Sequence, residues 1–291
     1  MYKLRRLFPG RALALVFSFL ALSLFGGAQT AAAQEFRLAV MQAQKGAAAK
    51  FKTLQSYLDQ HGIRTHLVAA ENYTAAAQMF ADGRVDGMFS GSGVAGAMII
   101  KKVAFPLLRP VANNGTSTYW AVVVACKGAP TFDGRADYFK GKKVASCALA
   151  SSGELFLRNI PGARAAVAEL KIVGSHGDAI EAVKKGEADI AIVKNLVWDN
   201  LKAQNPTLEK VGSDNGQNPN DALIVSAKTD QAFVKKLMET LLALKSDPGP
   251  EAAAVRRDLG IQGYILTSAA DFSHTLGLLQ RAGVGPDYDF R

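Results

Sequence analysis

The sequence predicts an α/β protein of two lobes, one inserted into the other. Strand-type runs alternate with helix-type runs, which is typical of βαβ units with mostly parallel sheets. Two polar segments rich in glycine or asparagine, Asn113–Gly115 and Asp214–Asn220, enclose a stretch that has strands of its own. A glycine–strand junction occurs twice, as Gly83-Arg84-Val85-Asp86 and Gly186-Glu187-Ala188-Asp189. Two lobes built on one plan and joined by two strands account for these observations, and a hinge is the expected consequence.

The first lobe is expected to contain residues 34–114 and 221–291. Ala47–Gln60 is predicted to be a helix because Phe51, Leu54 and Leu58 share one helical face. Asn72 can cap a helix that runs to Gly83. The other elements predicted here are strands Phe36–Met41, Thr65–Ala69, Val85–Phe89 and Ala222–Ser226, and helices Gly93–Lys102 and Phe233–Leu244.

The second lobe is expected to contain residues 115–220. Its predicted strands are Tyr119–Cys126, Lys143–Ser146, Leu170–Val173, Asp189–Val193 and Leu208–Val211. The chain has 291 residues, of which 49% are hydrophobic and 20% charged. This balance is that of an ordinary globular protein, and the length suffices for a sizeable core.

Residues 1–33 have the order of a secretory signal peptide. A basic start is followed by the apolar run Ala12–Phe25 and by Ala31-Ala32-Ala33, which has the form that signal peptidase recognises. The run is shorter than the roughly 20 residues of a membrane span, although a signal anchor is the alternative. No cysteine lies near the cleavage site, so we expect a periplasmic protein without a lipid anchor. Arg5-Arg6 leaves the choice between the general secretory and twin-arginine routes open.

Charge favours a small anionic ligand. Cleavage after Ala33 removes four basic residues and no acidic ones, so the formal net charge falls from +9 to +5. The basic residues are scattered, and we therefore expect no nucleic-acid partner. The two cysteines, Cys126 and Cys147, are predicted to form a disulfide in an oxidising compartment. Two buried free thiols are the main alternative, and a metal or catalytic role is a lesser one.

Two Ser/Gly turns, each between a predicted strand and a predicted helix, are the candidate ligand site. In one of them, Ser151, Ser152 and Gly153 could hold an oxyanion at a helix N-terminus, although a serine N-cap is the alternative. In the other, Ser90 and Ser92 lie in a turn of the same kind in the first lobe. Ligands of open α/β sheets bind at the carboxyl ends of strands, where both turns are expected.

Three further residues are candidates for the same site. His176 opens a predicted helix and could donate a hydrogen bond to an anion, or could be structural. Tyr73 and Tyr119 could line a cleft, or could belong to the core. We find no nucleophile elbow, phosphate-binding loop or paired histidine ligands. We therefore expect no catalytic residue, no metal and no cofactor.

Several motifs, in order, resemble the periplasmic phosphonate- and phosphite-binding proteins of ABC importers. The resemblance covers most of residues 36–226. It is carried by Asn72-Tyr73, Gly83-Arg84-Val85-Asp86, Gly91, Gly115, Tyr119-Trp120, Ser151-Ser152-Gly153, Gly174-Ser175-His176, Ala182-Val183, Ala188-Asp189 and Pro219-Asn220-Asp221. It implies the type II periplasmic-binding fold, with the lobes joined by two hinge strands, and a permease in the inner membrane as partner.

The resemblance also places the ligand. Ser151, Ser152 and the Gly153 N–H would hold the phosphonate oxygens, with a further hydrogen bond from His176. Tyr73 would reach in from the first lobe. Asp221 matches an aspartate that meets the ligand amine in aminophosphonate binders.

The sequence departs from this family at three positions. Ala150 replaces a cradle serine, Ser90 a tyrosine, and Leu196 the glutamate of an amine-binding member. These differences argue against an aminophosphonate. We expect a monomeric solute-binding protein that captures a small phosphonate-like oxyanion between its lobes and catalyses no reaction. The alternative is a periplasmic sensor or accessory protein of the same fold for another small anion.

Overall fold

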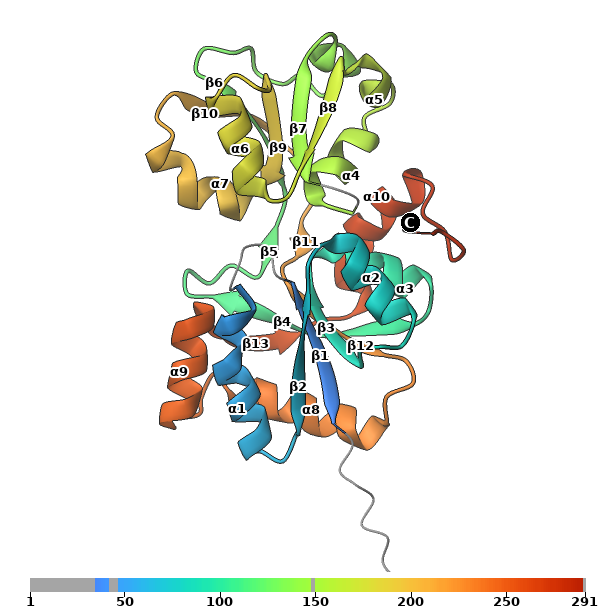
Figure 1. Ribbon diagram of the computed structural model, residues 1–291, viewed down its shortest axis with the longest axis vertical. Coiled ribbons are helices and arrows are strands. Elements are labelled where there is room, and N and C mark those ends of the chain that lie inside the picture. The colour runs from blue at the N-terminus through green and yellow to red at the C-terminus, as the bar shows by residue number, and fades with distance from the viewer. Residues whose placement is uncertain (1–34, 42–46, 148–149, 290–291) are drawn as a thin grey trace, which may run out of the picture. The chain divides into compact units, whose positions relative to one another are not determined.

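Two separate β-sheets form the centres of two lobes, and a short two-stranded ribbon lies between them (Figure 1). The computed structural model describes residues 35–41, 47–147 and 150–289. Residues 34–291 form one compact unit. The predicted signal peptide, residues 1–33, lies outside the described residues. Within the described ranges, no helix is long and apolar enough to cross a lipid bilayer.

The sheet of the first lobe has six strands in the order β13-β4-β12-β3-β1-β2. These strands are β1 (Phe36–Met41), β2 (Thr65–Ala70), β3 (Gly87–Ser90), β4 (Ala104–Ala112), β12 (Ala222–Ser226) and β13 (Ile261–Leu266). β1 runs parallel to β2 and β3, whereas β12 pairs antiparallel with both β3 and β4. The sheet therefore combines strands from two distant parts of the chain.

The sheet of the second lobe has five strands in the order β10-β6-β9-β7-β8. These strands are β6 (Ala121–Cys126), β7 (Lys143–Cys147), β8 (Glu169–Val173), β9 (Ile190–Lys194) and β10 (Leu208–Ser213). β7 is parallel to β8 and β9, and β6 is antiparallel to β9. The carboxyl ends of β7 and β9 therefore meet at one edge of the sheet, as binding at that edge requires.

Two chain crossings join the sheets. They pair with each other as the antiparallel ribbon of β5 (Thr118–Tyr119) and β11 (Asn218–Pro219). Described strands of the first sheet lie within residues 36–112 and 222–266, and those of the second within residues 121–213. The lobe limits expected at residues 114–115 and 220–221 remain a prediction.

Helices cover both faces of each sheet. Along β1, Leu38 and Val40 face one apolar cluster and Ala39 faces another, as the strand period of two residues dictates. The helices of the first lobe are α1 (Lys52–Gln60), α8 (Gln231–Ala243) and α9 (Pro250–Leu259) on one face, and α2 (Tyr73–Ala81), α3 (Ser92–Ile100) and α10 (Ser273–Arg281) on the other. Those of the second lobe are α4 (Ser152–Arg158) and α5 (Ala163–Ala166) on one face, and α6 (His176–Lys184) and α7 (Asn195–Leu201) on the other. The short 3₁₀ helices are η1 (Ala47–Phe51), η2 (Ala136–Phe139), η3 (Lys202–Gln204) and η4 (Ala269–Phe272).

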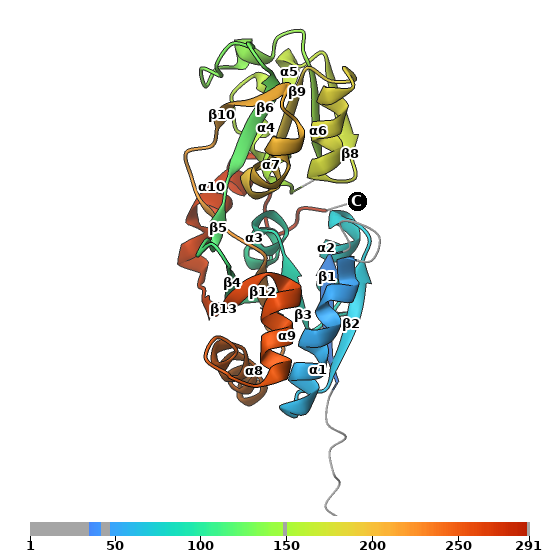
Figure 2. The same ribbon diagram turned by 90° about the vertical axis from the view of Figure 1, so that its left-hand side faces the viewer.

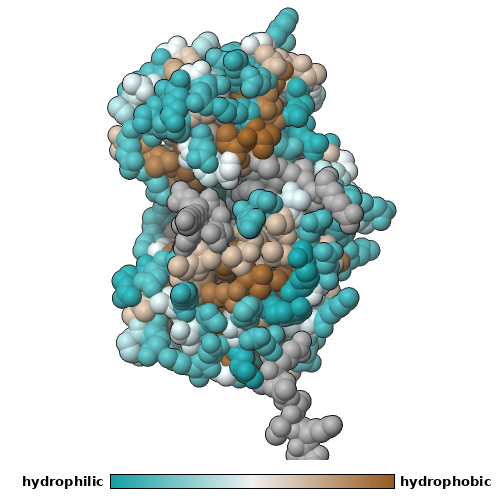
Figure 3. Space-filling model, in the orientation of Figure 1, coloured by the Kyte–Doolittle hydropathy of each residue, from teal (hydrophilic) through white to brown (hydrophobic). Residues whose placement is uncertain are grey.

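The large apolar side chains are mostly inside these layers. Figure 3 shows a mainly hydrophilic face with hydrophobic patches on both lobes. Among the described residues, the exposed large hydrophobic side chains are Ile172 on the edge strand β8 and Leu266 at the end of β13.

The repeated glycine–aspartate junction has the same structure in both lobes. Gly83 and Gly186 end helices with φ values of 67° and 73°, in the left-handed region that glycine adopts without strain. The carboxylate of Asp86 accepts a hydrogen bond from the Arg37 amide at 2.9 Å. In the second lobe, the Asp189 carboxylate accepts from the Lys143 amide at 2.7 Å. Each aspartate thus joins the start of one strand to its parallel neighbour, as two lobes built on one plan require.

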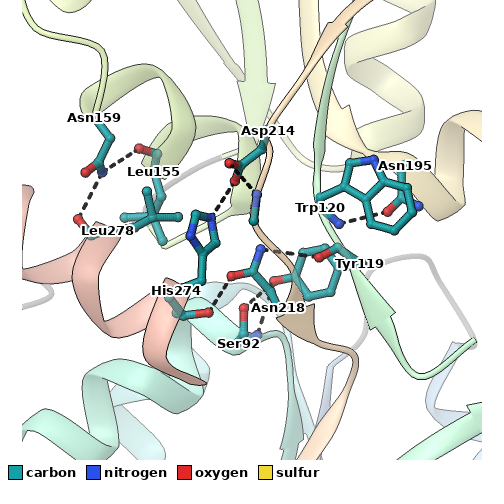
Figure 4. Close-up of polar contacts among 12 residues, drawn as sticks. Ser92, Tyr119, Trp120, Leu155, Asn159, Asn195, Asp214, Asn218, His274 and Leu278 are labelled. Carbon is teal, nitrogen blue, oxygen red and sulfur yellow. Dashed lines mark hydrogen bonds and ion pairs between the residues drawn. The ribbon is translucent and has the colours of Figure 1, made fainter. Parts of the chain in front are cut away.

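The C-terminal helix α10 links the two lobes. It packs against α3 of the first lobe, and its polar groups reach residues of the second lobe and of the crossings (Figures 2 and 4). His274 Nε2 lies 2.8 Å from the Asp214 carboxylate, and Thr275 donates to Asn218 Oδ1 at 2.5 Å. Asn159, the C-cap residue of α4, donates to the carbonyl oxygen of Leu278 at 2.9 Å. Beside the two crossings, α10 thus forms a third, non-covalent link between the lobes.

Candidate ligand-binding cavity

A cavity of about 390 Å³ lies between the lobes, at the carboxyl ends of β3, β7 and β9. It is lined by six of the predicted site residues, namely Ser90, Tyr119, Ser151, Ser152, His176 and Asp221. Its volume falls in the range of small-molecule sites. The two Ser/Gly turns therefore do face a common space.

Ser151 and Ser152 have different roles in the turn before α4. Ser151 is the N-cap, since its hydroxyl accepts from the Glu154 amide at 3.2 Å and donates to the Cys147 carbonyl oxygen at 3.0 Å. Ser152 is 8% exposed, and its hydroxyl has no hydrogen-bond partner among the described residues. An unpartnered buried hydroxyl is costly unless a ligand or water completes it. Ser152 is accordingly the stronger candidate for a ligand contact.

In the turn of the first lobe, Ser90 lines the cavity and Ser92 does not. The Ser92 hydroxyl lies 2.7 Å from the Tyr119 hydroxyl, to which the Ser92 amide also donates at 3.2 Å (Figure 4). Burial raises the pKa of Tyr119 to about 12, so this phenol is neutral. Ser92 therefore fixes a wall of the cavity and does not itself line it.

His176 is the first residue of α6 and lines the cavity. Burial, and secondarily the charge of Lys194, lower the pKa of His176 to about 4, so its imidazole is neutral at physiological pH. Its Nδ1 lies 3.5 Å from the Cys147 Sγ, and burial raises the pKa of this thiol to about 12. A protonated thiol can donate weakly to Nδ1, which would leave the proton of the ring on Nε2.

Several polar residues that line the cavity were missed from the sequence, among them Lys194 and Asn220. Lys194 ends β9, with its Nζ 3.3 Å from Asp221 Oδ1 and 4.6 Å from the centre of the Tyr119 ring. Asn220 is 8% exposed, and its Oδ1 is buried without a partner in the described ranges. The place of Lys194 at the carboxyl end of a predicted strand is the signal that could have found it.

An apolar surface faces these groups. Phe51, Phe89 and Tyr264 form a stack with ring centres 5.6 and 5.8 Å apart, and all three line the cavity. Pro110, Leu259 and Ile261 also line it. Lys50 adds a second cation, so two lysines and one aspartate leave a positive balance in the lining. Such a cavity suits an anion with an apolar part.

Comparison with known proteins identifies the family. The model of periplasmic substrate-binding proteins of phosphonate ABC transporters matches residues 38–272. The chain belongs to this family. No curated protein matches the sequence.

Three solved structures are similar to this phosphonate-type binding protein. PhnD1 from Prochlorococcus marinus, in complex with methylphosphonate, is 15% identical with a TM-score of 0.72, covering 87% of this chain and 99% of its own. A Xanthomonas citri protein bound to ATP is 18% identical with a TM-score of 0.70, covering 86% and 98%. A binding-protein component of a phosphonate transporter from Pseudomonas aeruginosa is 16% identical with a TM-score of 0.67, covering 86% and 85%. The two-lobed type II periplasmic-binding fold predicted from the sequence is confirmed.

Gly153 is required by the packing of α4 on β9. A Cβ atom on Gly153 would lie 2.1 Å from the carbonyl oxygen of Ile192 on β9. Glycine thus lets α4 approach β9 closely. Gly153 does not line the cavity of this binding protein, whereas its neighbours Ser151 and Ser152 do.

The predicted disulfide is wrong, since both Cys126 and Cys147 are free thiols. Cys126 ends β6, which runs antiparallel to β9, whereas Cys147 ends β7, which runs parallel to β9. The two strands therefore end at opposite edges of the sheet, and the thiols cannot meet. Cys126 is exposed and Cys147 is buried beside His176. Tyr73 is the first residue of α2, but its side chain lies outside the described residues.

Proposed function

We propose that residues 34–291 act in the periplasm as the substrate-binding protein of an ABC importer for a small phosphonate- or phosphite-like oxyanion. The observation that carries the proposal is the buried, unpartnered hydroxyl of Ser152, which lines a cavity with a net positive lining. A hydroxyl donor and a positive surrounding offset the cost of moving an oxyanion out of water.

The solved relatives support a phosphorus oxyanion. One contains methylphosphonate and another ATP, which share this chemistry although they differ greatly in size. In the proposed complex, Ser151 caps the turn, the Ser152 hydroxyl and the Gly153 N–H hold the oxygens, and neutral His176 donates from Nε2. Asn220 and the first-lobe turn at Ser90 complete the polar part of the site.

The state of the side chains supports binding without catalysis. The Cys147 thiol has a pKa raised to about 12 and the His176 imidazole a pKa lowered to about 4. A thiol is a poor nucleophile while it is protonated, because the thiolate is the reactive species. The partners of the protein are then its ligand and an inner-membrane permease. A monomer without a nucleic-acid partner completes the proposal.

A thermal-shift screen of residues 34–291 tests the proposal. The panel contains phosphite, phosphate, methylphosphonate, ethylphosphonate, sulfate, ethanesulfonate and propionate. A ligand at about 100 times its dissociation constant adds roughly 2.7 kcal/mol to the free energy of unfolding. We expect a shift with at least one phosphorus oxyanion and none with propionate. No shift with any phosphorus oxyanion would overturn the proposal and favour a sensor for a different anion.

A further inference from the structure

The cavity contains a complete cation site, and the protein fills this site itself. A carboxylate and the face of an aromatic ring together form a site for an ammonium group. Asp221 and Tyr119 provide these two partners, and the Lys194 ammonium lies between them, 3.3 Å from Asp221 Oδ1 and 4.6 Å from the ring centre.

The parts of this site are held from different directions. Tyr119 lies on the first crossing and is fixed by the hydroxyl of Ser92. Asp221 follows the second crossing with a φ of 44°, in the left-handed region that is strained for most residues. Lys194 extends from β9 of the second lobe, and its side chain is 15% exposed. The arrangement is therefore built by three segments.

An ammonium group on a ligand would find no unpaired carboxylate among the described residues that line the cavity. Among the described residues that line the cavity, Asp221 is the single acidic one, and Lys194 is already paired with it. A ligand amine would have to displace the Lys194 ammonium or lie beside it, and like charges repel. The stack of Phe51, Phe89 and Tyr264 instead offers an apolar surface to an uncharged substituent.

We infer that Lys194 is a specificity-determining residue, which makes the cavity select oxyanions with uncharged, apolar substituents over those that carry an amine. This inference rests on the proposed function, because it concerns the substituent of the oxyanion bound there. Lys194 thus excludes aminoalkyl ligands by holding its own ammonium where theirs would bind.

Two matched ligand pairs test this inference. Propylphosphonate and 2-aminoethylphosphonate have equally long chains and differ by a methyl against an ammonium, and so do propanesulfonate and 2-aminoethanesulfonate. Calorimetry gives the ratio of the two dissociation constants within each pair. We expect the wild type to prefer the alkyl member by about tenfold or more, and Lys194→Ala to reduce that preference at least about fivefold.

Further variants separate charge from shape. Lys194→Met keeps an apolar stem against Tyr119 and removes the charge, so its preference should fall as well, which keeps the test valid if Lys194→Ala unfolds. Lys202→Ala is the matched control. Lys202 is a surface lysine of the same lobe that does not line the cavity, and its Nζ pairs with Asp199 Oδ1 at a distance of 2.8 Å. Lys194→Ala should gain affinity for the amine-bearing ligand. The double variant Lys194→Ala/Asp221→Asn should lose this affinity again, because the carboxylate that pairs with the amine is gone.

The outcomes distinguish this inference from the proposed function. If an oxyanion pair binds and its ratio is the same within twofold in the wild type and in both Lys194 variants, the role of Lys194 in specificity is refuted. If no member of either pair binds any variant, the proposed function fails instead.

Discussion

Removing the Ser152 hydroxyl should weaken ligand binding without weakening the fold. In the free protein this buried oxygen has no described partner, so Ser152→Ala removes an unsatisfied group and should leave the melting temperature unchanged or slightly higher. In the complex, the lost hydrogen bond to a charged group is worth about 1.5–3 kcal/mol. The dissociation constant should therefore rise about 10- to 150-fold.

Ser151→Ala is the matched control for this experiment. It removes the N-cap of α4 and the bond to the Cys147 carbonyl oxygen, and loss of a cap costs about 0.5–2 kcal/mol of stability. Thermal melts of the free proteins and calorimetry with the strongest ligand of the screen measure both quantities. If Ser152→Ala lowers the melting temperature as much as Ser151→Ala and leaves affinity unchanged, Ser152 is structural and our reasoning fails.

Three other predictions concern packing, protonation and the thiols. Gly153→Ala should cost about 1–3 kcal/mol, because its Cβ would lie 2.1 Å from the Ile192 carbonyl oxygen, and an unchanged melt would contradict the close packing of α4 on β9. The pKa of His176 falls from 6.5 to about 4 on folding, so the unfolded chain takes up more protons between these values and stability decreases as pH falls through them. Between pH 7 and pH 5 the wild type should lose more thermal stability than His176→Gln, and parallel losses would refute this. A thiol reagent should modify Cys126 in the folded protein and Cys147 only after unfolding. If neither cysteine reacts in the folded or the unfolded state, the two cysteines form a disulfide after all.

The sequence predicted most of the elements but missed an interior strand. Periodic apolar runs and glycine stops identified β1, β2, β12 and the helices α1, α2, α3 and α8. β4 was missed because it contains Pro106 and Pro110, and proline is rare inside a sheet since it lacks the amide donor. Pro106 is tolerated next to a bulge, where the register between β12 and β4 shifts at Leu223 and Ile224. Tertiary pairing of this kind leaves no local signal.

The sequence indicated those site residues that belong to recognisable turns. It did not indicate those that meet only because distant segments of the chain pack together. Serines and a histidine after predicted strands include four residues that line the cavity, namely Ser90, Ser151, Ser152 and His176, and their contacts with a ligand stay a prediction. The aromatic stack combines Phe51, Phe89 and Tyr264 from three distant segments, and sequence spacing cannot show that they meet. The cysteine pairing failed for a related reason, because it depended on strand direction.

Helix α10 gives any rotation of the lobes a preferred direction. The two crossings pair with each other, and α10 is bonded to Asn218 of the second crossing through Thr275 and to Asp214 through His274. In Figure 1, α10 lies at the right, whereas α7 and α9 lie at the left. Val197 of α7 and Leu259 of α9 line the cavity. A rotation about α10 would keep these bonds while it moves the cavity-lining residues of α7 and α9 relative to each other, whereas a rotation that separates the lobes at α10 would have to break them.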